Sequence, residues 1–177
     1  MDYGVLHIFL PAFMLVFLGT ISVWSHVRKN KKINVGEWTA SAMKTELKLV
    51  DLFFKVLLVL SIGLSVLYAY FPEYYYIAGP IEWLDVPVIN TVGVLVLKTS
   101  LVWIVMAQFN IEKTIAMFNS GVSKGSLPKL FTYSRKLILT GMLIMFFGLF
   151  ITISSVLAIM ICIIATWLFD RVKRLSV

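Results

Sequence analysis

Long apolar runs separated by shorter polar segments dominate this chain. The first three runs cover 22 or 23 residues each. An α-helix rises about 1.5 Å per residue, so about 20 apolar residues cross a hydrocarbon core of about 30 Å. The first run begins near Gly4 with no basic segment before it, so we expect a true span rather than a cleaved signal. The predicted spans lie at about 4–25, 49–71 and 88–109.

The last apolar run, Leu137 to Phe169, is 33 residues long. As one straight helix it would measure about 50 Å, which exceeds a hydrocarbon core of about 30 Å. Two antiparallel helices that turn near Ser154 and Ser155 use this length better, although each is short for a span. The run therefore predicts a helical hairpin, with helices at about 137–153 and 156–169.

Small residues in this run bear on how its helices pack. Gly141 and Gly148 are seven positions apart and therefore fall on one helical face. Glycines on one face let two membrane helices approach closely. We expect a neighbouring helix to pack against that face. Cys162 lies in the same run without a second cysteine to pair with, so a structural role is expected for it.

Composition narrows the fold to a membrane protein. Hydrophobic residues make up 60% of the 177 residues and charged residues 14%, and the mean hydropathy is +0.92. A backbone inside the bilayer must satisfy its own hydrogen bonds, and long unbroken apolar runs favour helices over a barrel. The sequence therefore predicts an all-α, polytopic membrane protein that forms a single domain over residues 1–177.

Basic residues predict the topology. Of the sixteen Lys and Arg residues, six fall within 28–48, five within 113–136 and three within 171–174. With a terminal hairpin all three clusters lie on one side of the membrane, and the positive-inside rule makes that side cytosolic. The sequence thus predicts five transmembrane helices, with the N-terminus outside and the C-terminus in the cytosol. The net charge of +7 then indicates topology and contacts with anionic membrane lipids, not nucleic acid.

The polar segment between the second and third runs has the opposite character. Residues 72–87 hold acidic and aromatic side chains and no Lys or Arg. Tyrosine and tryptophan gather where membrane meets water. We expect this segment to form an aromatic belt at the outer face.

Lys98 stands near the centre of the third predicted span. A lysine there costs about 2.5 to 3.5 kcal/mol on insertion scales, so it is expected to face the bundle interior or a wet cavity. Two roles remain open. The lysine either snorkels or pairs with a carboxylate, or it contacts an anionic group of a ligand.

Most enzyme chemistry finds no support in the sequence. No cysteine, histidine and carboxylate group has the spacing of a metal site, and no serine or cysteine nucleophile has a nearby base. His7 and His26 are expected to be structural. We therefore expect no metal and no hydrolytic site.

The junction before the hairpin is the remaining candidate site. Phe131, Tyr133, Ser134 and Arg135 directly precede the charge-free part of the last run. An arginine fork binds a carboxylate or phosphate, and aromatic faces attract cations. The same residue types also occur in any helix that enters a membrane from its basic side, so a ligand site and a plain interfacial segment both remain open here.

The segment Lys129 to Met142, KLFTYSRKLILTGM, resembles the hallmark region of membrane-embedded methyltransferases. This family includes isoprenylcysteine carboxyl methyltransferase and the phospholipid N-methyltransferases. The matching positions are Phe131, Tyr133, Ser134, Arg135, Ile138, Gly141 and Met142. The specific motif spans about fourteen residues, and the predicted five-helix plan with a cytosolic C-terminus also agrees with the family.

Several positions differ from the family pattern. Lys129 and Thr132 replace its opening glycine and first arginine, and Leu137 and Leu139 replace its proline and following tyrosine. The family also has two glutamates and a tyrosine-rich tail after its last helix. Around that place this sequence has Asp170 among Arg171, Lys173 and Arg174.

The resemblance implies methyl transfer from S-adenosylmethionine, held at the cytosolic face, to a lipid or prenylated acceptor that enters from the membrane. It implies that Arg135 contacts the cofactor carboxylate or the acceptor, and that catalysis depends on this residue. Phe131, Tyr133 and Ser134 then line the cofactor site, and Gly141 permits close approach of the cofactor.

Two other functions stay open on the sequence. A noncatalytic helical membrane protein could serve as an assembly partner or as an inactive relative of the family. A small-solute pathway could use Lys98, although such pathways place polar residues on several spans and this chain offers few.

Overall fold

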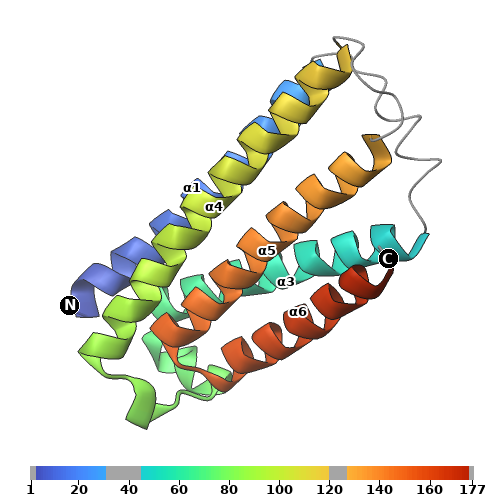
Figure 1. Cartoon of the computed structure of the whole chain (residues 1–177). Coiled ribbons are helices and arrows are strands. Elements are labelled where there is room, and N and C mark those ends of the chain that lie inside the picture. Colours follow the sequence, from blue (N-terminus) through green and yellow to red (C-terminus); the bar gives the residue numbers. More distant parts are fainter. Residues whose placement is uncertain (1–2, 31–44, 120–126, 176–177) are drawn as a thin grey trace.

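A computed structural model of the chain describes residues 3–30, 45–119 and 127–175 (Figure 1). This part of the chain contains no β-strand, so the prediction of an all-α fold is confirmed. The long helices are α1 (Tyr3–Asn30), α3 (Thr45–Tyr70), α4 (Pro87–Asn119), α5 (Leu127–Ile153) and α6 (Val156–Leu175). Two short 3-10 helices, η1 (Pro72–Ala78) and η2 (Glu82–Leu84), join α3 to α4.

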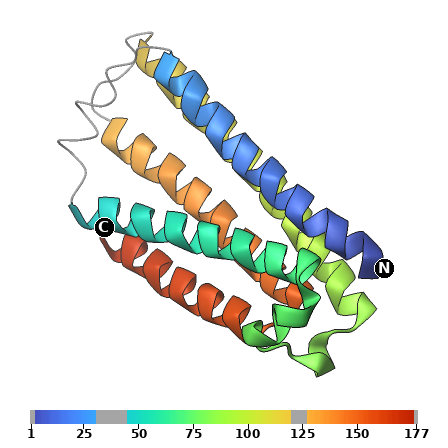
Figure 2. The same ribbon diagram turned by 180° about the vertical axis from the view of Figure 1, so that it is seen from behind.

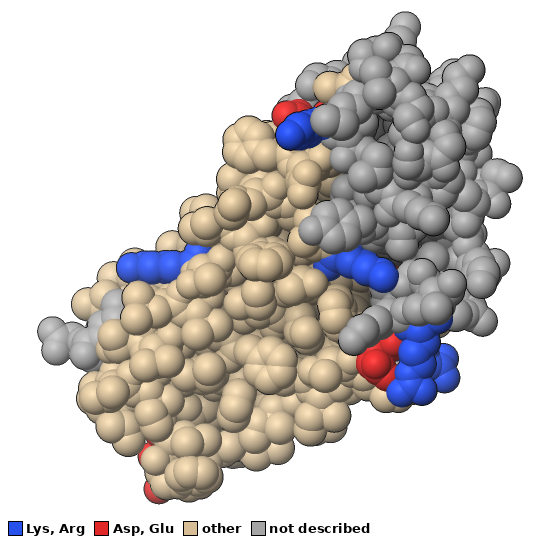
Figure 3. Space-filling view, viewed as in Figure 1, with Lys and Arg blue, Asp and Glu red and all other residues tan. Residues whose placement is uncertain are grey.

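Four helices within the described residues are long and apolar enough to cross a membrane. Their apolar stretches are Val5–Trp24, Leu49–Tyr70, Pro87–Lys113 and Lys136–Ile153. Figure 3 shows uncharged residues covering most of the described surface of one face, with few charges between the two ends. These features are those of a multi-pass membrane protein.

Residues 110–136, which connect the predicted spans 88–109 and 137–153 and were expected to form a loop, are helical over most of their length. Helix α4 continues to Asn119 and α5 begins at Leu127, so both helices extend well beyond the apolar runs. Hydropathy marks where a helix leaves the lipid, not where the helix ends, because backbone hydrogen bonds also form in water. Good helix formers such as Glu112, Lys113 and Ala116 favour the continuation of α4.

The predicted hairpin turn at Ser154 and Ser155 is confirmed. Helix α5 ends at Ile153 and α6 begins at Val156. Ser154 adopts a left-handed backbone conformation with φ of 49°, which lets the chain reverse within two residues. Both serines are buried, so their backbone groups need partners within the protein.

The segment between α3 and α4 supplies those partners. Ile81 N donates to Ser154 O at 2.8 Å, and Val156 N donates to Gly79 O at 2.9 Å. The Tyr75 hydroxyl donates to Ile153 O at 2.6 Å. Burial raises the pKa of Tyr75 above its ordinary value, so the phenol keeps its proton to a higher pH than a free tyrosine does.

The rest of the segment fits the predicted aromatic belt. Tyr74, Tyr76 and Trp83 are exposed, with Trp83 at 77%. We call this end of the bundle the aromatic end. The segment therefore has two structural roles, because Tyr75 and its neighbours hold the hairpin turn while the exposed rings cover the surface.

Helices α4 and α5 pack closely through glycines. A Cβ atom on Gly148 would lie 2.9 Å from the backbone nitrogen of Leu97, and one on Gly141 would lie 2.7 Å from Ile104 Cδ1. A Cβ on Gly93 would lie 2.6 Å from the backbone nitrogen of Thr152. The prediction that Gly141 and Gly148 admit a neighbouring helix is confirmed, and that neighbour is α4.

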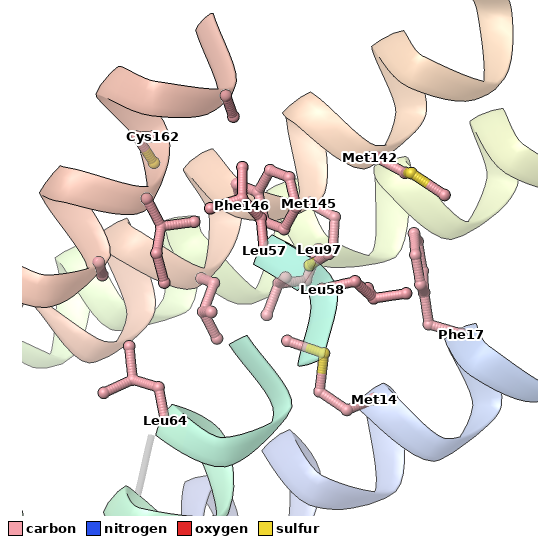
Figure 4. Close-up of a cluster of buried hydrophobic side chains, with 14 of the residues drawn as sticks. Met14, Phe17, Leu57, Leu58, Leu64, Leu97, Met142, Met145, Phe146 and Cys162 are labelled. Carbon is pink, nitrogen blue, oxygen red and sulfur yellow. The ribbon is translucent and has the colours of Figure 1, made fainter. Parts of the chain in front are cut away.

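The core lies where the five long helices meet. Figure 4 shows Met14 and Phe17 of α1 converging with Leu58, Met145 and Phe146, and each of these side chains is at least nine-tenths buried. Membrane helices gain little from the hydrophobic effect between one another, so close packing supplies the attraction. The interdigitated methionine, leucine and phenylalanine side chains provide it.

The two ends of the bundle differ. Figures 1 and 2 show that α1, α4 and α6 end, and α3 and α5 begin, at the end opposite to the aromatic end. We call this the basic end, because Lys113, Lys136, Arg171 and Arg174 belong to it. The hairpin thus returns the last basic cluster to the end at which α5 begins, as the run length predicts.

Candidate functional site

The family-like motif occupies the first turns of α5, at the basic end. The side chains of Phe131, Tyr133, Ser134 and Arg135 lie outside the described residues, so their expected roles remain predictions. Their positions on the helix follow from α5 being continuous from Leu127 to Ile153.

Helical spacing divides the motif positions between faces. Arg135 is seven positions before Met142, which is buried in the core, so the two positions fall on one stripe of α5. Phe131 is four positions before Arg135 and shares that stripe. Ser134 is seven positions before Gly141 and falls on the stripe that meets α4. Tyr133 falls about half a turn away from Phe131, so the helix does not bring all four positions together.

Gly141 has a clear packing role. The space next to its Cα is filled by Ile104 and Trp103 of α4, and the Trp103 indole nitrogen donates to Leu137 O at 3.0 Å. Helix packing accounts for the glycine without a ligand. Its expected role in the approach of a cofactor remains a prediction.

Gln108 on α4 is a polar residue that sequence reasoning missed. It is 1% exposed, and neither its Nε2 nor its Oε1 has a hydrogen-bond partner among the described residues. A buried unpaired polar group costs about 1 to 3 kcal/mol. Such a group calls for an explanation, such as a ligand, a water molecule or a group outside the described residues.

The register of α4 against α5 places this amide beside the motif. Gly93 meets Thr152, Leu97 meets Gly148, and Ile104 meets Gly141, so each step along α4 matches an equal step backwards along α5. Extending this register by four residues brings Gln108 level with Leu137. That level lies between Gly141 and Arg135.

The sequence did contain a signal for Gln108. It is an uncharged polar residue inside the apolar stretch Pro87–Lys113, and polar residues within membrane spans often serve a function. Its burial and its level against the motif could not be predicted, because both depend on how α4 packs against α5.

Lys98 does not face the bundle interior, which was one of the two positions expected for it. Its side chain is exposed on the flank of α4, with Nζ 6.0 Å from the ring centroid of Phe9 on α1. The packed face of α4 passes through Leu97, and the next residue is turned by about 100°. The long apolar stem can carry the ammonium towards water. A contact with an anionic ligand and a small-solute pathway at Lys98 both remain predictions.

The other candidate groups have structural settings. His7 Nδ1 lies 2.9 Å from Ala69 O, and its ring stacks on Tyr68 at a centroid distance of 5.1 Å. Cys162 is buried. Within the described residues no three His, Cys, Asp or Glu side chains are grouped so as to hold a metal ion.

Comparisons with known protein families, with curated proteins and with solved structures found no significant match to this chain. The candidate site is therefore defined by the motif at the start of α5 and by the buried amide of Gln108 beside it.

Proposed function

We propose that this chain is a membrane methyltransferase that uses S-adenosylmethionine and modifies a lipid or prenylated acceptor at the cytosolic face. The observation that carries the proposal is the unpaired, buried amide of Gln108 level with the motif on α5. The motif suggests a cofactor site, and the amide provides an independent polar group where that site is expected.

The proposed topology has five spans, with α6 as the fifth. Helix α6 has 20 residues, but its uncharged part, residues 156–169, rises only about 21 Å, so the proposal requires the bilayer to thin locally around it. Its antiparallel return brings Arg171 and Arg174 to the basic end. The positive-inside rule then makes the basic end cytosolic and places the N-terminus outside.

The residues present suit the cofactor. The amide of Gln108 offers one donor and one acceptor side by side, a pattern that pairs with the edge of an adenine ring. In this proposal Arg135 binds the cofactor carboxylate through its fork of N–H donors. Phe131, on the stripe of Arg135, provides aromatic surface for the sulfonium cation, and Ser134 adds a hydroxyl on the side that meets α4, whereas Tyr133 falls on another face of α5 and is not assigned to this contact.

The chemistry demands little acid or base catalysis from the protein. When bound, the cofactor supplies an electrophilic methyl group, and its sulfur keeps the electron pair of the broken carbon–sulfur bond. The residues of this chain need to align the acceptor in line with that bond and to exclude water. The scarcity of titratable groups within the spans is compatible with such a role.

The test is a calorimetric titration of the purified, detergent-solubilised protein with S-adenosylhomocysteine, in parallel with Gln108→Leu. We expect the wild-type protein to bind and the variant to bind about tenfold more weakly or worse, because a pair of hydrogen bonds is lost. The variant should be at least as stable to unfolding as the wild type, because a desolvated amide is replaced by an apolar side chain of similar size.

The two possible failures are distinguishable. Absence of heat from the wild-type protein at high ligand concentration rejects the proposed function. Equal affinities of the two proteins remove Gln108 from the site and leave the binding of the cofactor to be explained by the motif on α5 alone. Because the variant is expected to remain folded, a loss of binding without a loss of stability identifies a ligand contact.

A further inference from the structure

A groove runs between α5 and α6 on the outside of the bundle, away from the α4 side of α5. Phe147 and Phe150 of α5 form one wall. The groove has a volume of about 430 Å³, within the range of about 300 to 1,000 Å³ found for small-molecule sites. The residues of α6 that line it are Ile159, Cys162, Ile163, Thr166, Trp167 and Asp170.

The groove is apolar along most of its length and charged at one end. Its α6 residues follow the three- and four-residue spacing of one helical face, from Ile159 to Asp170, which spans about 16 Å. Asp170 is the single ionised side chain in the lining, and it lies at the basic end. An occupant therefore needs a long apolar part and a polar part at the basic end.

The charged end is net positive. Arg174 Nε donates to Asp170 Oδ2 at 2.8 Å, so the aspartate is neutralised by its neighbour one turn on. Arg171 is not used in this pair. Its guanidinium carbon lies 4.6 Å from the ring centroid of Trp167, and it forms no hydrogen bond or ion pair with another described residue.

The contact with Trp167 places the guanidinium of Arg171 over a ring that lines the groove. Trp167 is 56% exposed and is itself part of the lining. A stacked guanidinium keeps its N–H donors in the ring plane available, and their fork geometry matches a phosphate. An apolar groove next to an available arginine suits an amphipathic anion.

We propose that this groove binds one anionic phospholipid, with an acyl chain between α5 and α6 and the net-negative headgroup beside Arg171. This site is separate from the proposed methyl-donor site, because Phe147 and Phe150 lie on a different side of α5 from Gly141 and Gly148. The inference therefore does not depend on the proposed function.

The test uses lipids with a photoreactive diazirine in the acyl chain, in nanodiscs that contain the full chain. Phosphatidylglycerol, phosphatidylcholine and phosphatidylethanolamine carry the same labelled chain, and peptide mapping locates the crosslinks. We expect crosslinks within residues 147–167 to be several-fold more frequent with phosphatidylglycerol than with the other two lipids. In Arg171→Gln this preference should disappear, whereas the phosphatidylcholine yield should be unchanged, which shows that the groove remains folded.

Lys113→Gln is the matched control, because it removes a positive charge from the exposed end of α4 at the same end of the bundle. It should keep the preference. Equal yields from all three lipids overturn the proposal. A higher yield from phosphatidylethanolamine also overturns it and assigns the headgroup contact to Asp170. No crosslinks within residues 147–167 from any of the three lipids would also overturn it.

Discussion

Replacing Gly93 by alanine should destabilise the helix bundle by about 3 kcal/mol, at the upper end of the usual cost of overpacking. The new Cβ would lie 2.6 Å from the backbone nitrogen of Thr152 and 2.9 Å from its Cα. These are backbone atoms, which cannot rotate away as the end of a side chain can. Helices α4 and α5 must therefore separate or shift along each other. Chemical unfolding of the protein in detergent micelles, monitored by circular dichroism, measures the loss in the free energy of unfolding.

Gly63→Ala is the control for this effect. Apart from the adjacent backbone of α3 itself, no atom lies within 4 Å of the Cβ that alanine would place at Gly63. In this variant the higher helix propensity of alanine, worth up to about 1 kcal/mol, should stabilise α3. Equal destabilisation by the two substitutions would contradict the close α4–α5 contact.

Arg135→Ala should weaken binding of S-adenosylhomocysteine by roughly 10- to 150-fold. This range corresponds to the loss of hydrogen bonds to a charged group, about 1.5 to 3 kcal/mol. Arg135→Lys should recover part of the affinity, because lysine keeps the charge but lacks the planar fork. The measurement is calorimetric titration of each variant in detergent.

Lys113→Ala controls for a general loss of positive charge at the basic end. Lys113 is exposed on α4, and its removal should leave the affinity within about twofold, because interactions between exposed charges are weak and screened. Similar losses in Arg135→Ala and Lys113→Ala would show that the cofactor responds to the overall charge rather than to a specific contact.

Run length made the hairpin predictable. An apolar run of 33 residues is too long for one span, and two serines near its middle marked the turn that the structure has at Ser154 and Ser155. The seven-residue spacing of Gly141 and Gly148 likewise identified the face that meets another helix. Both predictions follow from local rules of length and period.

The ends of α4 and α5 were not predictable in the same way. Residues 110–119 belong to α4 and residues 127–136 to α5, although hydropathy falls there. A helix that continues into water keeps its backbone hydrogen bonds and loses only its apolar pattern. The hydropathy profile therefore located the apolar spans but not the helix ends.

The surroundings of single polar residues depended on packing between helices. Lys98 was expected to face the bundle interior or a wet cavity because a lysine in lipid is costly, and it lies on the flank of α4 beside Phe9. Gln108 drew no prediction and is 1% exposed. Lys98 and Gln108 are ten positions apart on α4 and therefore differ in face and depth. Only the register of α4 against α5 decides which of these two side chains is buried.

The proposed topology and the proposed cytosolic site both require that the terminal hairpin places the ends of α4 and α6 in one compartment. The single cysteine, Cys162, can be replaced by alanine, and one new cysteine can then be introduced by Lys113→Cys, Arg174→Cys or Trp83→Cys. All three positions are exposed in the structure. Labelling of sealed membrane vesicles with an impermeant maleimide should reach positions 113 and 174 from the same side, and position 83 from the opposite side. Labelling of position 174 from the same side as position 83 would contradict the account.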